Sequence, residues 1–119
     1  LPGIPYWLVG SPRHSRARIA ATLAHGAALV WTDFGENRLA LFAEELERPH
    51  ICFTHGGWLV AASGKQCRVY RADGRSPRLE TILEGLRDVP FAVLPTERHD
   101  QFALCLQDGT LEVYQMPRS

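Results

Sequence analysis

Apolar and polar residues alternate along most of this chain, and glycine turns interrupt the alternation. From residue 27 onwards the period is two, which is typical of β-strands. Residues 15–25 fit either a helix or a strand, and the hairpin beside them favours a strand. The other expected strands cover residues 6–9, 28–33, 38–43, 50–54, 58–62, 66–71, 79–83, 91–94, 102–106 and 110–116. The pattern therefore predicts an all-β protein with little helix.

Polar segments separate these strands and suggest how the chain is organised. Glu44–Pro49 is charged and ends in proline, which predicts a loop or a short helical turn. The Asp-Gly pair at 108–109 lies between two alternating runs, a strong signal for a tight hairpin. We predict an N-terminal arm with one short strand over residues 1–14 and a single domain over residues 15–119.

One strand–turn–strand pattern recurs three times. Each copy ends in a strand with an aromatic residue, and these strands are Leu39–Phe42, Cys67–Tyr70 and Leu111–Tyr114. The first two copies are 28 residues apart and the last two are 44 apart. A period of about 40–45 residues is typical of four-stranded repeats. The shorter interval predicts that Glu44–Pro49 skips or truncates an outer strand.

The stretch Cys67–Gln115 alternates strands with polar turns and resembles a blade of the WD-repeat β-propellers. This resemblance implies that 79–83 is the outer strand of one blade and that the last three strands are the inner strands of the next. Residues 50–71 then form the inner strands of the preceding blade, and residues 19–43 form a more divergent one. The chain departs from the family in lacking its Gly-His pair, and Tyr70-Arg71 and Tyr114-Gln115 replace its Trp-Asp pair. The general pattern is also similar to the propeller domains of bacterial MoxR–vWA–propeller systems.

The resemblance implies a partial β-propeller of two to three antiparallel four-stranded blades. Propellers close with about four to eight blades, so three arrangements fit: a piece of a larger propeller, copies that assemble into a ring, or a small β-sandwich or barrel. Open strand edges have unpaired N–H and C=O groups that pair readily with another chain. We therefore expect a protein partner or another propeller segment at these edges, with a homo-oligomer as one form.

The composition of the chain argues against several classes of function. The 13 basic and 13 acidic residues balance, whereas nucleic-acid binders usually have a basic excess. No apolar run approaches the roughly 20 residues of a membrane-spanning helix, so no membrane partner is expected. The three cysteines Cys52, Cys67 and Cys105 lie in strand-like runs, which favours buried free thiols and a cytoplasmic location. A bridge from Cys67 to either of the others stays open if neighbouring strands bring the pair together.

Candidate chemistry is sparse. His50, Cys52 and His55 are residue types that bind zinc, but no second ligand pair is nearby. We expect no metal, cofactor or catalytic residue, and hence no enzyme. The runs Trp31-Thr32-Asp33 and Arg98-His99-Asp100 come closest to acid–base groups, but both lie beside turns, where Asp commonly bonds backbone N–H groups.

The loops between strands are the better candidates for function. Loops on a rigid sheet scaffold often carry binding residues, and here they are residues 34–37, 54–57 and 96–101. We predict a protein-interaction or scaffold module. The alternative is a lectin-like oligomer that binds glycan through Trp31 and Trp58, which occupy equivalent places in the repeat; core packing is the other interpretation of these two residues. The candidate binding residues are Trp31, Asp33, His55, Trp58, Arg98, His99 and Asp100.

Overall fold

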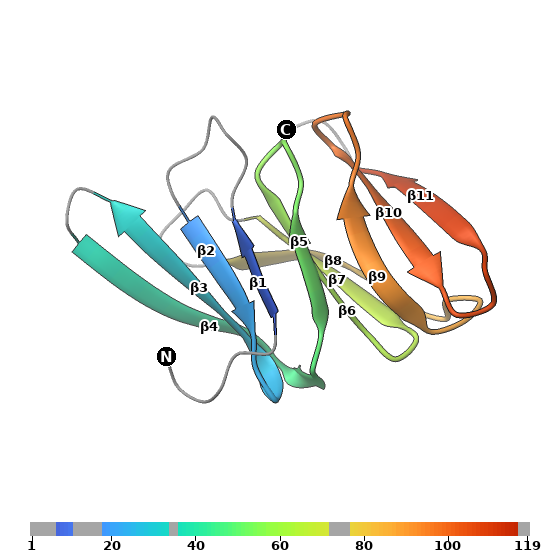
Figure 1. The fold of residues 1–119 in the computed structure, drawn as a ribbon, viewed down its shortest axis with the longest axis horizontal. Helices are drawn as coiled ribbons and strands as arrows, with labels where there is room; N and C mark the ends of the chain where they lie inside the picture. The colour runs from blue at the N-terminus through green and yellow to red at the C-terminus, as the bar shows by residue number, and fades with distance from the viewer. Residues whose placement is uncertain (1–6, 11–17, 34–35, 72–76, 117–119) are drawn as a thin grey trace.

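The computed structural model describes residues 7–10, 18–33, 36–71 and 77–116, and every regular element among them is a β-strand (Figure 1). Among these described residues, no helix is long and apolar enough to cross a membrane. The strands are β1 Trp7–Gly10, β2 Arg18–Thr22, β3 His25–Asp33, β4 Glu36–Glu47, β5 His50–Phe53, β6 Trp58–Ser63, β7 Gln66–Arg71, β8 Arg78–Leu83, β9 Pro90–Pro95, β10 Gln101–Leu106 and β11 Leu111–Gln115.

These strands form three open antiparallel sheets, each from consecutive segments of the chain. The first sheet has the order β1-β2-β3-β4, the second β5-β6-β7-β8, and the third β9-β10-β11. The sheets lie side by side with the second in the middle (Figure 1). The expected all-β class with antiparallel sheets of this size is therefore confirmed.

The N-terminal half resolves one ambiguity of the sequence. Residues 18–22 form strand β2, as the hairpin beside them suggested, and not a helix. The short N-terminal strand is β1, which pairs with β2 at Trp7↔Thr22 and so belongs to the first sheet. The proposed boundary at residue 14 lies outside the described residues, as do residues 34–35 of the first loop.

The prediction for Glu44–Pro49 was wrong, because β4 continues to Glu47 and pairs with His25 at its far end. Glu44 and Glu45 are exposed, but Leu46 is buried in the core, which keeps the strand on the sheet. The strand bulges on the way, since Ala43 has a φ of 53° opposite the register shift between His25 and Ala27. The exposed Glu44, Glu45 and Glu47 give this part of the strand the charged pattern that predicted a loop.

The first copy of the repeated pattern is also out of phase with the other two. Leu39–Phe42 lies in the fourth strand of its sheet, whereas Cys67–Tyr70 and Leu111–Tyr114 both lie in third strands. This explains the interval of 28 residues without any truncated strand, because the first sheet has all four strands. Trp31 and Trp58 are not equivalent either, since β3 is a third strand and β6 is a second strand.

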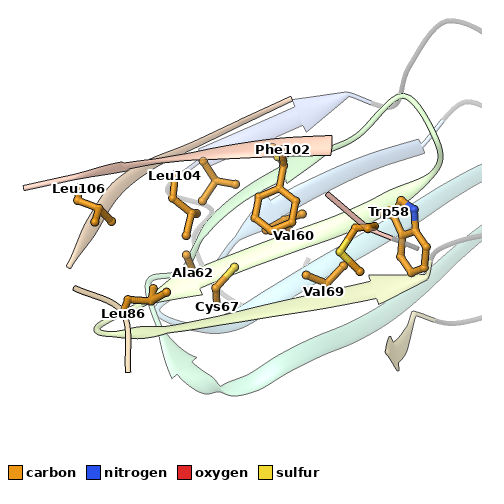
Figure 2. Close-up of a cluster of buried hydrophobic side chains, with 12 residues drawn as sticks. Trp58, Val60, Ala62, Cys67, Val69, Leu86, Phe102, Leu104 and Leu106 are labelled. Carbon is orange, nitrogen blue, oxygen red and sulfur yellow. The ribbon is translucent and has the colours of Figure 1, made fainter. Parts of the chain in front are cut away.

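The second sheet is buried on both faces, and this arrangement organises the core. One face packs on the first sheet through Leu59, Ala61 and Tyr70, with Phe42 and Tyr70 ring centroids 5.2 Å apart. The other face packs on the third sheet through a second cluster (Figure 2). Strand β6 has no polar face, so five of its residues in a row, Trp58–Ala62, are buried. A strand with two covered faces reads as a continuous apolar run.

Candidate functional site

Two of the predicted loops meet at the end of β6. The Gly56 N–H donates to the His99 carbonyl oxygen at 2.6 Å, and the His55 and His99 ring centroids are 6.4 Å apart. The Asp100 carbonyl oxygen in turn accepts from the Met116 N–H at 2.6 Å, which ties the loop to the end of β11. The sequence pattern located both loops, and their contact is a finding of the structure.

Trp58 connects this loop cluster to the core. Its indole Nε1–H donates to Asp100 Oδ1 at 3.1 Å, and its backbone N–H donates to Thr54 Oγ1 at 3.1 Å. Only 3% of the residue is exposed, and Figure 2 shows it at one end of the second cluster, opposite Leu86 and Leu106. A buried indole usually finds such a partner for its N–H. Trp58 therefore packs between the second and third sheets.

Arg71 covers the Trp58 ring, a contact that the sequence reasoning missed. The two residues are direct cross-strand partners, and the guanidinium carbon lies 4.0 Å from the ring centroid. This is cation–π geometry. Arg71 also lies 4.0 Å from Glu80 Oε1. A signal for the pair existed, because the two-residue turn at Gly64-Lys65 sets the register that places 58 opposite 71.

A groove of about 530 Å³ opens beside Trp58, between the second and third sheets. This volume lies within the range of about 300–1,000 Å³ that is usual for binding pockets. Strands β8 and β11 border the groove where they diverge from each other. Its lining residues are Trp58, Arg71, Glu80, Thr81, Leu83, Tyr114, Gln115 and Met116.

Tyr114 and Glu112 lie on the face of β11 that points towards the second sheet. Tyr114 stacks on Phe102 with ring centroids 5.4 Å apart, and its hydroxyl donates to Glu112 Oε2 at 3.4 Å. Burial and the Glu112 carboxylate raise the pKa of the Tyr114 hydroxyl. Among the described residues, Glu112 Oε1 is the buried side-chain atom without a hydrogen-bond partner. Such an atom loses its hydration without compensation.

Each end sheet has large exposed apolar residues on its outer face. On the third sheet, Leu94, Leu111 and Val113 are 49%, 61% and 53% exposed. On the first sheet, Ile19 and Leu39 are 46% and 50% exposed, and Leu41 is similar. A half-buried antiparallel sheet normally has polar residues on its open face. We call these surfaces the first-sheet end face (Ile19, Leu39, Leu41) and the third-sheet end face (Leu94, Leu111, Val113).

The remaining predicted residues do not join the cluster around Trp58 and Asp100. Trp31 and Asp33 lie in β3 of the first sheet, and their side chains lie outside the described residues. Arg98 is exposed, and its backbone N–H donates to Thr96 Oγ1 at 3.2 Å. Four of the seven candidates, His55, Trp58, His99 and Asp100, therefore come together in the structure, whereas Arg98, Trp31 and Asp33 lie apart from this cluster.

Burial makes two of the cysteines poor nucleophiles. All three cysteines are free thiols, and burial raises the pKa of Cys52 and Cys67 to about 12, which disfavours the reactive thiolate. His50 and Cys52 share a face of β5, and burial lowers the pKa of His50. In the part of the chain that the structure describes, no three His, Cys, Asp or Glu residues gather in a way that could hold a metal ion.

Comparison with known proteins gives no relative from which a role could be transferred to these surfaces. No protein-family model, no curated protein and no solved structure matches this chain.

Proposed function

We propose that this chain is a non-enzymatic protein-interaction module of the β-propeller type, in which each sheet is one blade and the end faces receive further sheets. The arrangement of the first strands supports blades over a two-layer sandwich. Strand β5 contacts both β1 and β9, so the first strands of all three sheets gather together. The last strands β8 and β11 diverge around the groove.

The repeat itself provides the observation that carries this proposal. Cys67 and Val69 in β7 correspond to Leu111 and Val113 in β11, since both pairs lie opposite the same places of the preceding strand. Cys67 and Val69 are 0% exposed because the third sheet covers them, whereas Leu111 and Val113 are 61% and 53% exposed. Equivalent apolar positions are therefore buried by a neighbouring sheet in the second sheet and exposed in the third sheet. Exposed apolar patches of this kind mark interaction sites.

The two end faces complement each other. We call the face of a sheet that points towards the next sheet in the chain its following-side face, and the opposite face its preceding-side face. In both core clusters of the described residues, the following-side face of one sheet packs on the preceding-side face of the next. The third-sheet end face is a following-side face, and the first-sheet end face is a preceding-side face. Copies of this chain would therefore associate head to tail, a heterologous contact that forms a ring when the rotation closes. Two copies hold six sheets, which is within the propeller range of about four to eight.

The lectin alternative requires an accessible aromatic face for a sugar ring. The Trp58 ring is covered by Arg71 and its indole N–H is bound to Asp100, so we place protein interaction first. We further propose a cytoplasmic location, which the free thiols favour because oxidising compartments promote disulfides.

Light scattering on a size-exclusion column tests the proposal through the Leu111→Lys variant. We expect the unaltered chain to form dimers or larger species whose mass rises with concentration, because association covers both end faces. Leu111→Lys introduces a charge into the contact and should leave a folded monomer. The matched control is Glu97→Lys, which changes an exposed loop residue and should associate like the unaltered chain. An unaltered chain that stays a folded monomer at every concentration would contradict the proposal.

A further inference from the structure

We infer that the free edge of β11 binds an extended segment of a partner protein as a fourth strand of the third sheet, with side chains of that segment filling the groove beside Trp58. This inference deepens the proposed function and rests on it, because it assumes that the chain acts through protein contacts. It concerns the backbone edge of β11 and the groove, whereas the third-sheet end face consists of side chains, including those of Leu111 and Val113, on the opposite face of the sheet from the groove.

The first observation is that β11 pairs only with β10 among the described strands, although the other two sheets each have a fourth strand. Strand β7, the counterpart of β11, pairs with β8 over Cys67–Arg71. An open edge is a template for β-strand addition, in which main-chain hydrogen bonds give affinity and side-chain pockets give specificity. The groove lies directly beside this edge and is lined by β11 itself.

The hydrogen bonds of the hairpin identify which backbone groups the edge offers. The Leu106 N–H donates to the Thr110 carbonyl oxygen, and the Met116 N–H donates to the Asp100 carbonyl oxygen. Bonded and non-bonded pairs alternate along an antiparallel ladder, so Glu112 and Tyr114 direct their backbone groups to β10. Their neighbours in the sequence direct N–H and C=O away from β10; these are Leu111, Val113 and Gln115.

The chemistry of the occupant follows from Tyr114, which lines the groove, and Glu112, which lies two residues away on the same face of β11 and accepts a hydrogen bond from the Tyr114 hydroxyl. Tyr114 of β11, Met116 just after this strand, and Leu83 of β8 provide apolar lining, which suits an apolar side chain. The buried Glu112 Oε1 lacks a hydrogen-bond partner, which calls for a donor such as Lys, Arg, Ser or Thr. Residues two apart share a face of a strand. The partner segment therefore carries an apolar residue and a donor residue with one residue between them.

Hydrogen exchange of the complete chain with synthetic peptides tests this inference. The probe is a pool of peptides of the pattern Thr-Thr-Lys-Thr-Leu-Thr-Thr, with Lys, Arg, Ser or Thr at the donor position and Leu, Ile, Phe or Tyr at the apolar position. We expect peptides from the pool to slow exchange of the Leu111, Val113 and Gln115 amides about tenfold. The control peptide has the same composition with Lys and Leu adjacent, and it should protect these amides much less.

Two further controls separate strand addition from other modes of binding. Val113→Pro removes one outward N–H without breaking the ladder to β10, so peptides should no longer protect the Leu111 and Gln115 amides. The matched variant Val113→Ala keeps this N–H, so peptides should still protect both amides. Peptides that are N-methylated at the amides facing β11 should fail with the unaltered chain, which covers the case that Val113→Pro does not fold.

Three results would overturn the inference. The first is the absence of protection with every peptide in the pool, and the second is equal protection by the N-methylated peptides. The third is protection of these amides in the Leu111→Lys variant, measured without peptide, that rises with protein concentration; this would assign the edge to a second copy. The first two results concern peptide binding, and the third is measured in a variant that should not associate through its end face. Failure of the strand site and failure of the proposed function are therefore distinguishable.

Discussion

At the scale of single residues, burial decides what the reactive side chains can do. Trp58 looks like a ligand platform in the sequence, but its ring lies under Arg71 and its N–H is bound to Asp100. The carboxylate of Asp100 is likewise engaged with the indole. The side chains that looked most like chemistry therefore hold two loops to the second sheet, and the exposed apolar residues of the end faces become the better candidates for contact with a partner.

The buried thiols make stability sensitive to alkaline pH. Burial raises the pKa of Cys52 and Cys67 to about 12, above the ordinary value of 9.0. Between these values the unfolded chain loses thiol protons that the folded chain keeps, so the free energy of unfolding falls as the pH rises above 9. At pH 10.5 we expect a loss on the order of 1–2 kcal/mol per thiol relative to pH 8.

Urea denaturation at pH 8 and at pH 10.5 measures this loss. Other groups also titrate in this range, so the control is the double variant Cys52→Ala/Cys67→Ala, in which the difference between the two pH values should be smaller. An equal difference in both proteins would mean that the two thiols titrate alike in the folded and unfolded chains.

At the scale of elements, Gly26 allows β3 and β4 to remain paired through the bulge. Its φ is 78°, and a Cβ there would lie 2.7 Å from the Cα of Glu44. Gly26→Ala should destabilise the chain by about 1–3 kcal/mol for the backbone strain, and further through the clash with β4. Gly109→Ala is the matched control, because its φ is 88° and a Cβ there meets no atom within 4 Å. Chemical denaturation of both variants measures the difference; equal losses would remove the clash from the explanation.

The elements also mark what the sequence could predict and what it could not. Alternation located β9, β10 and β11 because one face of each strand meets the core and the other does not. It failed for residues 44–47, where exposed Glu44 and Glu45 alternate poorly with buried Leu46. Sheet membership was harder still, since the short β1 completes the first sheet and shifts the phase of the repeat. Local pattern records which face is buried, whereas the place of a strand within its sheet depends on distant partners.

For the candidate site, too, the sequence predicted local features but not the contacts between distant segments. The glycine turn at 55–57 and the polar loop at 96–101 were visible in the sequence, but their contact depends on packing between the second and third sheets. The groove beside Tyr114 left no local signal, because it arises where two strands of different sheets diverge. The apolar residues of the third-sheet end face were visible in the sequence, yet only the structure distinguishes them from their covered counterparts Cys67 and Val69.

At the scale of the whole molecule, the second sheet should be the most stable part of the chain. Both of its faces pack on a neighbouring sheet, whereas the first and third sheets each pack on one neighbour among the described strands. Regions with more buried contacts open less often to solvent. In native-state hydrogen exchange, we therefore expect the amides of β6, Leu59–Ala62, to exchange more slowly than those of β10. The comparison must be made on the Leu111→Lys variant, which is expected to be a monomer, so that association does not cover the third-sheet end face.

If β10 exchanged as slowly as β6 in that variant, the three sheets would open as one cooperative unit. The end faces would then need no neighbour to hold the outer sheets in place.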